Sequence, residues 1–222
     1  YTDGMRNIYD MAIDPLMNMF TYGNTNDGGG WNVRFTHQIQ SADYGYPRKF
    51  KNFIAEIVPA LVDLGGGSGV GAMYLSEPGW PDRLNNIPLM GDWGRRKTYF
   101  HKVTPLGATY TTEQVAEIGG NQVTDMDTDA AGRLYLASWG GAGFKDNKDK
   151  GYVELITPKE FSPSPYPVDL TKISDLELLE LLKSPSSTGR FHASREILNR
   201  PNYSKFNSIA KLSEDKKLSI ES

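Results

Sequence analysis

The feature that most constrains this chain is an abrupt change in composition near residue 152. All but one of its 23 glycines and all four tryptophans precede that point. The later part is instead rich in Leu, Lys, Ser and Glu. Four prolines fall within residues 158–168 and favour an extended, semi-rigid connection. We therefore predict one domain at 1–157, a proline-rich linker at 158–168 and a second domain at 169–222.

The first part has the composition of a fold with many short strands and tight turns. Its β-branched and aromatic residues gather in short runs bounded by Gly, Pro, Asn or Asp. The predicted strands are residues 8–13, 17–22, 87–92, 98–103, 123–128, 133–138 and 151–156. Twice, a strand leads through an Asp-containing turn into a second strand, which is typical of propeller blades. We predict a mainly β fold with about three β-propeller blades in an arc; an irregular β-sandwich is the alternative.

The second part has the pattern of two short amphipathic helices. Leucines and Ile173 form an apolar stripe over residues 173–182, and Ser174 followed by Glu177 matches a capping box. A second helix is expected over about 188–199, before Pro201. Two such helices cannot bury their apolar faces alone, so they are interpreted as one unit of a stacked helical repeat.

Charge and cysteine content exclude several classes of function. A formal net charge of −3 gives no reason to expect nucleic acid or an anionic membrane as a partner. Without cysteine there is no disulfide, thiolate metal site or cysteine nucleophile in these residues. No apolar run reaches the roughly 18 residues of a membrane span. Because the chain starts at Tyr1, inside a strand-and-turn pattern, we expect both ends to be cuts.

Two segments near the start have the residue types of a ligand or metal site. Residues 22–32 combine glycines, which let backbone carbonyls approach an ion, with the Asn and Asp oxygens that calcium prefers. Arg6 and Asn7 precede this loop and offer bidentate contacts to a carboxylate. The structural alternative is that 22–32 is simply a long turn.

Other conspicuous residues favour structural roles. The glycine-rich run 65–71 lacks the Lys-Ser/Thr ending of a phosphate-binding loop and leads into a strand, which predicts a tight turn. Arg95 and Arg96 lie in a turn between strands, facing either substrate or solvent. The three histidines are far apart in sequence and are expected to be structural: His37, His101 and His192.

Several motifs, in order, resemble the glucose/sorbosone dehydrogenase family of six-bladed propellers. They are Gly4–Ala12, Asn24–Trp31, Asp43–Pro47, Gly65–Gly69, Gly91–Arg95, Thr124-Asp125 and Gly132–Trp139. The similarity is greatest to the propeller of large "membrane-bound dehydrogenase" proteins, in which HEAT-type repeats and a cytochrome c domain follow. Residues 175–200 are similar to the first of those repeats. The resemblance thus implies that 169–222 begins a HEAT-like repeat.

The resemblance also implies a site. In quinoprotein members an Arg-Asn pair at the place of Arg6 and Asn7 contacts pyrroloquinoline quinone (PQQ), and a glycine-rich loop binds the associated calcium. Arg6 and Asn7 are therefore predicted to bind cofactor, with Arg95 as a substitute for a family lysine that falls at Gly94. The predicted calcium loop comprises Asn24, Asn26, Asp27 and Gly28.

The chain also departs from the family pattern. Gln122 and Thr124 stand near the positions of two cofactor-binding arginines. The family's general-base histidine belongs to an earlier blade that these residues do not include, so the fragment alone is expected to be inactive.

The leading prediction is a fragment of a PQQ- and calcium-dependent sugar dehydrogenase, acting on a sugar or polyol and passing electrons to a cytochrome c domain of the same protein. From the family alone, its location would be periplasmic or extracellular. One alternative is a non-catalytic propeller that binds carbohydrate or protein. Another is a calcium-dependent, lactonase-like propeller hydrolase, which requires metal-binding side chains to converge near the axis.

Overall fold

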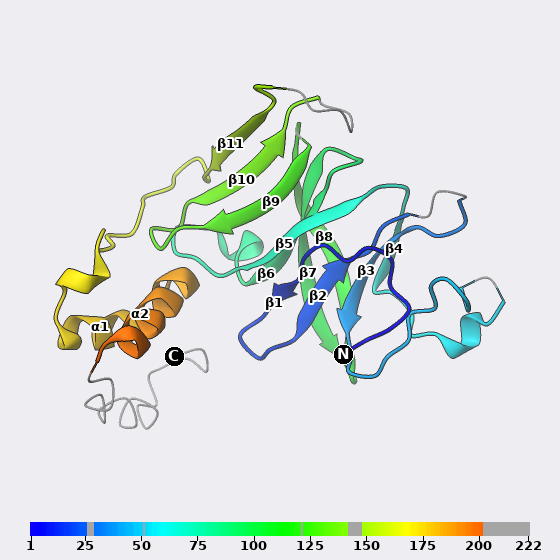
Figure 1. Cartoon of the computed structure of the whole chain (residues 1–222), viewed down its shortest axis with the longest axis horizontal. Coiled ribbons are helices and arrows are strands. Elements are labelled where there is room, and N and C mark those ends of the chain that lie inside the picture. The colour runs from blue at the N-terminus through cyan, green and yellow to red at the C-terminus, as the bar shows by residue number, and fades with distance from the viewer. Residues whose placement is uncertain (26–28, 51, 121, 142–147, 202–222) are drawn as a thin grey trace. The chain divides into compact units, whose positions relative to one another are not determined.

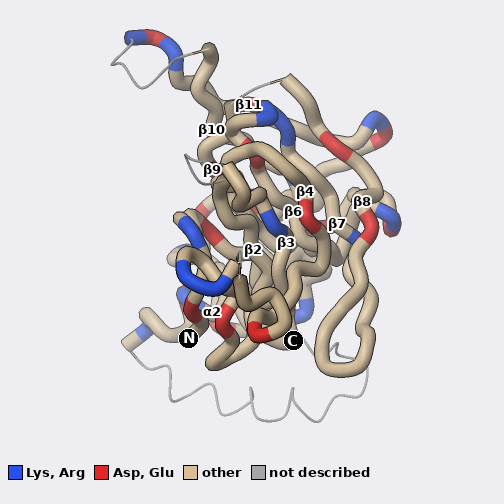
Figure 2. Tube along the Cα trace, turned by 90° about the vertical axis from the view of Figure 1, so that its right-hand side faces the viewer, with Lys and Arg blue, Asp and Glu red and all other residues tan. Residues whose placement is uncertain are grey.

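The chain is seen in a computed structural model, which describes residues 1–25, 29–50, 52–120, 122–141 and 148–201. Eleven strands form three separate antiparallel sheets, and the described residues contain two α-helices (Figure 1). The predicted mainly β class is confirmed. Three separate sheets are consistent with three blades of a partial propeller. Basic and acidic residues are interspersed along the described trace (Figure 2).

The first two sheets have four strands each and the third has three. The first has the order β1(Ala12–Ile13), β2(Met19–Tyr22), β3(Val33–Gln38), β4(Val62–Gly65). The second has the order β5(Gly69–Leu75), β6(Ile87–Asp92), β7(Lys97–Leu106), β8(Thr109–Gly119). In the third, β10(Leu134–Trp139) lies between β9(Val123–Thr128) and β11(Gly151–Ile156).

One apolar core joins the first two sheets. Its members come from β1, β2, β3, β5, β6 and β7: Ala12, Phe20, Tyr22, Val33, Phe35, Ala72, Met90 and Tyr99. All six residues of β6 are buried, as expected for an inner strand covered on both faces. In β10, buried Leu134, Leu136 and Ser138 alternate with half-buried residues, which is the period of two expected of a strand.

The observed strand boundaries can be compared with those predicted from local sequence patterns. β6, β9 and β11 have the predicted bounds. The predicted strand 8–13 is wrong over most of its length, because only Ala12–Ile13 pairs. Asp10 explains this: its carboxylate accepts the Met11 N–H at 2.8 Å and the Ala72 N–H at 2.9 Å, so side-chain hydrogen bonds replace a ladder there.

The chain divides into two compact units: residues 1–75, 82–127 and 135–155 form one, and residues 76–81, 128–134 and 156–222 form the other. The second unit contains α1(Asp175–Leu181) and α2(Ser187–Asn199), whose buried contacts are Leu178, Leu182, Ala193 and Ile197. The capping box of Ser174 and Glu177 is present as predicted. The HEAT-like repeat stays a prediction, and residues 202–222 lie outside the described part.

Candidate functional site

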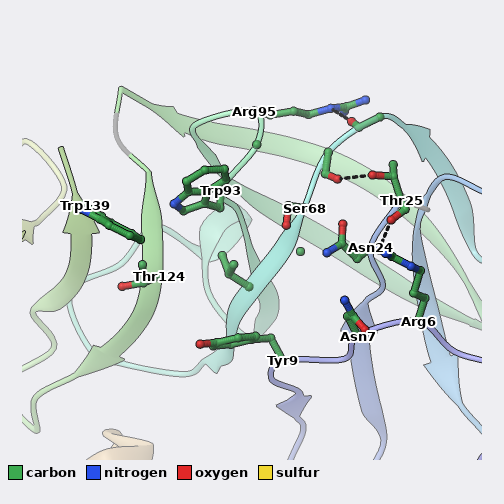
Figure 3. Close-up of a pocket in the computed structure, with 15 residues that line it drawn as sticks. Arg6, Asn7, Tyr9, Asn24, Thr25, Ser68, Trp93, Arg95, Thr124 and Trp139 are labelled. Atoms are coloured by element: carbon green, nitrogen blue, oxygen red, sulfur yellow. Dashed lines mark hydrogen bonds between the residues drawn. The ribbon is translucent and has the colours of Figure 1, made fainter. Parts of the chain in front are cut away.

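Fifteen residues of the first unit line a pocket of about 820 Å³, a volume within the range of small-molecule sites (Figure 3). They come from six segments of the chain: Arg6, Asn7 and Tyr9; Asn24 and Thr25; Gly66–Val70; Trp93–Arg95; Thr124; and Trp139. All four predicted site residues that the structure describes, Arg6, Asn7, Asn24 and Arg95, are among them. The structure thus brings the three cofactor candidates and Asn24, one of the calcium candidates, to one pocket.

The segment that carries Arg6 is fixed by pairing with the Asp43–Pro47 motif. The Tyr44 N–H donates to Asp3 O at 3.0 Å, and the Tyr46 N–H donates to Gly4 O at 2.8 Å. Gly4 has a φ of +73°, and a Cβ there would overlap Asp43 and Gly45, so only glycine fits. Two motifs that are about 40 residues apart in sequence therefore form one local structure.

Arg6 links this segment to the neighbouring loop. Its Nη1 donates to Thr25 O, and its guanidinium carbon lies 5.9 Å from the ring centroid of Tyr46, in cation–π range. The Asn24 N–H donates to Arg6 O at 3.0 Å. Asn7 follows with a φ of 48°, a left-handed conformation that Asn tolerates. Figure 3 shows Asn7 beside Arg6, with Asn24 above it.

The glycine-rich loop connects β4 of the first sheet to β5 of the second and rests on Asp92. It is shorter than the turn predicted over residues 65–71, because Gly65 belongs to β4 and Gly69–Gly71 belong to β5. The Asp92 carboxylate is fully buried, and its Oδ1 accepts the N–H groups of Ser68 and Arg95, both at 2.9 Å. A Cβ on Gly67 would overlap the Asp92 carboxylate, so the loop can approach this closely only with glycine. Sequence reasoning did not identify Asp92, whose role depends on its burial.

Arg95 lies along the same loop. Its Nε donates to Gly66 O at 2.6 Å, its Nη2 donates to Leu64 O, and its Nε is 4.0 Å from Asp92 Oδ2. The guanidinium therefore braces the loop at the edge of the pocket, as Figure 3 shows. A guanidinium has five N–H donors, so two backbone contacts leave capacity for an anion.

The aromatic side of the pocket was not predicted. Trp93, Trp139 and Tyr9 lie on the side opposite Arg6 (Figure 3). The backbone N–H of Trp93 donates to Ser68 O, and the backbone N–H of Trp139 donates to Gln122 O, both at 2.8 Å. Both tryptophans belong to motifs that sequence analysis used only for the resemblance.

The predicted calcium ligands are only partly described. Asn24 lines the pocket, whereas Asn26, Asp27 and Gly28 lie outside the described residues. Among the residues that the structure describes, no three His, Cys, Asp or Glu side chains come together. The Thr25 and Gly67 carbonyls already accept hydrogen bonds from Arg6 and from the Thr25 hydroxyl.

None of the histidines lines this pocket. His101 is fully buried in the core, stacked on Phe35 with 4.3 Å between ring centroids and hydrogen-bonded to the Tyr22 hydroxyl. Burial lowers the pKa of His101 to about 4, so its ring is neutral at pH 7. His37 contacts Thr109, and His192 lies beside Tyr166. These surroundings agree with the structural roles expected of them.

Comparison with known proteins supports the fold. No protein-family model matches the sequence, and no curated protein is similar to it. A crystal structure from Thermus thermophilus, described as an oxidoreductase (glucose dehydrogenase), is similar with a TM-score of 0.55 and 15% identity; the match covers 70% of this chain and 47% of that one. The chain therefore spans about half of that protein's length. At this identity the similarity establishes the fold and not the activity.

Two further solved structures are also sugar dehydrogenases by description. The PQQ-bound aldose sugar dehydrogenase from Streptomyces coelicolor has a TM-score of 0.48 and 17% identity, over 70% of this chain and 44% of that one. A glucose dehydrogenase has a TM-score of 0.47 and 13% identity, over 61% of this chain and 41% of that one.

No helix in the described part is both long and apolar enough to cross a membrane.

Proposed function

We propose that this chain is the cofactor-binding part of a PQQ-dependent sugar dehydrogenase. The observation that carries the proposal is the convergence of Arg6, Asn7 and Asn24 with the glycine-rich loop on one pocket, in a fold similar to part of the Thermus protein. The family motifs predicted these residues from sequence, and the pocket holds them together.

The pocket residues fit the chemistry of PQQ, a planar quinone with three carboxylates. Arg6 and Arg95 supply positive charge, and Asn7, Asn24 and Ser68 supply neutral polar groups at the same pocket. When bound, PQQ would accept the hydride removed from a sugar or polyol. The residues of this chain would bind and orient it: Arg6, fixed through Thr25 and Tyr46, would contact a carboxylate, while Asp92 and Arg95 keep the adjacent loop in shape.

Oxidation of a sugar hydroxyl also needs a general base to accept the hydroxyl proton. Among the described residues that line the pocket, none is a His, Asp or Glu. The proposal therefore places the general base in a part of the protein outside these residues and assigns binding, not turnover, to this chain. Calcium held by residues 24–28, electron transfer to a cytochrome c domain, and a periplasmic or extracellular location are further parts of the proposal, supported by the sequence resemblance.

The second candidate is a non-catalytic propeller that binds carbohydrate or protein. The neutral residues Gly94, Gln122 and Thr124, at positions where the family has cations, favour it.

Calorimetry with PQQ, in the presence and absence of calcium, tests the proposal on the full chain. We expect binding that weakens by about tenfold or more in an Arg6→Ala, Asn7→Ala variant, since hydrogen bonds to charged groups contribute about 1.5–3 kcal/mol. Arg83→Ala, which changes an exposed arginine outside the pocket, is the matched control and should bind like the wild type. Absence of PQQ binding in a folded chain would favour the carbohydrate- or protein-binding alternative.

A further inference from the structure

The pocket has two flanks of different chemistry. Arg6, Asn7 and Asn24 form what we name the polar flank, and Tyr9, Trp93 and Trp139 form the aromatic flank. Figure 3 shows the two flanks facing each other across the pocket, with Ser68 between them. A ligand that fills the pocket therefore meets charge and amides on one side and ring faces on the other.

The backbone of both tryptophans is held by hydrogen bonds. Trp93 directly follows β6, and its backbone N–H donates to Ser68 O. Trp139 is the last residue of β10, and its backbone N–H donates to Gln122 O. Both side chains are half-buried. Tyr9, by contrast, is 74% exposed. Trp93 and Trp139 are thus the two half-buried rings of the aromatic flank, and Tyr9 is its exposed ring.

The aromatic flank is suited to a conjugated ring. The three described residues that form it carry no charge, and the neighbouring Thr124 hydroxyl donates to Ala137 O at 3.2 Å. A flat conjugated ring placed here loses no hydrogen bonds to water from its faces and gains offset or edge contacts with the indoles.

We propose that Trp93 and Trp139 form a stacking subsite for a planar conjugated ring, whose carboxylate groups lie against the polar flank. The pocket is thereby specific for planar aromatic acids over acids without a ring. This inference rests on the proposed function, because it concerns the same pocket and PQQ belongs to that ligand class. It goes beyond that function, because it attributes part of the ligand affinity to two uncharged residues, Trp93 and Trp139.

Three probes separate stacking from charge: PQQ, 2-naphthoate, and citrate, which is a tricarboxylate without a ring. Binding of each to the full chain is measured by calorimetry, for wild type and for Trp93→Leu and Trp139→Leu. We expect each leucine variant to bind PQQ and 2-naphthoate about five- to tenfold more weakly. Citrate binding should not change in these variants and should weaken in Arg6→Ala.

Two controls separate stacking from a folding defect. Trp93→Phe and Trp139→Phe keep a ring and should retain affinity for both planar acids within about threefold. Phe53→Leu changes an aromatic residue that is 51% exposed and lies outside the pocket, so it should bind all probes like the wild type. Circular dichroism and thermal melting of every variant confirm that the chain is folded.

The outcomes distinguish this inference from the proposed function. If PQQ binds and the leucine variants bind it as tightly as the wild type, the stacking subsite is wrong while the cofactor proposal stands. If PQQ does not bind, but 2-naphthoate binds and is weakened by the leucine variants, the subsite stands and the cofactor proposal is wrong. If neither planar acid binds the folded wild type, both are wrong.

Discussion

Asp92 in the first compact unit and Glu77 in the second are both buried, with exposed fractions of 0% and 1%. Asp92 accepts N–H groups from Ser68 and Arg95 and so holds an irregular loop that lines the pocket. Glu77 accepts the Thr188 N–H at 2.9 Å and the Thr188 hydroxyl at 2.7 Å, at the first turn of α2. A buried carboxylate thus shapes a binding loop in one unit and anchors a helix in the other.

The electrostatics of the two units also differ. Burial, the largest cause, raises the pKa of Glu77, although hydrogen bonds from Ser186, Thr188 and Thr128 oppose the shift. In the first unit the buried base His101 has its pKa lowered to about 4 by burial. An acid with a raised pKa and a base with a lowered pKa give stabilities that change in opposite directions with pH.

The largest expected effect is loss of the acceptor under the pocket loop. Asp92→Ala leaves the Ser68 and Arg95 N–H groups without their partner, and we expect about 2–4 kcal/mol less free energy of unfolding. Ligand binding should weaken as well, because the Gly66–Gly69 loop loses its support. Urea denaturation and calorimetry measure the two effects. Asp92→Asn keeps an acceptor oxygen and should lose less free energy of unfolding than Asp92→Ala. Equal losses in the two variants would mean that the charge of Asp92, not its hydrogen bonds, stabilises the loop.

Acid should destabilise the first unit through His101. The unfolded chain binds a proton near pH 6.5, whereas the folded unit resists protonation until about pH 4. The contribution of His101 is therefore complete above pH 6.5 and is lost as the pH falls, up to about 3 kcal/mol below pH 4. Denaturation between pH 7 and pH 4 measures this loss, which His101→Gln should reduce. An unchanged pH dependence in that variant would contradict the assignment.

Glu77 should give the opposite sign in the second unit. Its raised pKa means that the folded unit binds a proton more tightly than the unfolded chain, so stability is greatest below the ordinary value of 4.5 and falls as the pH rises through the raised pKa. Trp80 belongs to this unit and is 8% exposed, so its fluorescence reports unfolding there. The Trp80 signal is obtained by comparing the wild type with Trp80→Phe.

Substitution at Glu77 separates its charge from its hydrogen bonds. Glu77→Ala removes the acceptor for Thr188 and should cost about 2 kcal/mol in the second unit. Glu77→Gln keeps an acceptor without the charge and should flatten the pH dependence reported by Trp80. If Glu77→Gln keeps the wild-type slope, another group is responsible for it.

The smallest expected effect concerns the cap of α1. Ser174→Ala removes the hydroxyl that accepts the backbone N–H of Glu177 in the capping box. We expect the free energy of unfolding of the second unit to fall by about 1 kcal/mol. Thermal melting followed by Trp80 fluorescence measures this change, while ligand binding in the first unit should be unaffected. A loss of binding in this variant would show that the two units are energetically coupled.

The sequence predicted elements best where local pattern and burial coincide. β9 alternates exposed Asp125 and Asp127 with buried Met126 and Thr128, and its bounds were predicted to the residue. β8 was missed, because its Thr109–Gly119 run is mostly polar, has no buried residue and is held by pairing with β7. The predicted strand before Ala12 was wrong because Asp10 bonds the backbone itself.

By itself, the sequence determined the mainly β class and the two helices with the Ser174 cap, and its motifs predicted four residues that line one pocket: Arg6, Asn7, Asn24 and Arg95. These depend on short-range periods, turn residues and motifs. Only the tertiary structure decided that Trp93 and Trp139 face Arg6 and that Asp92 lies buried under Gly67. Such contacts join residues far apart in sequence, and burial and proximity arise only when the sheets pack together.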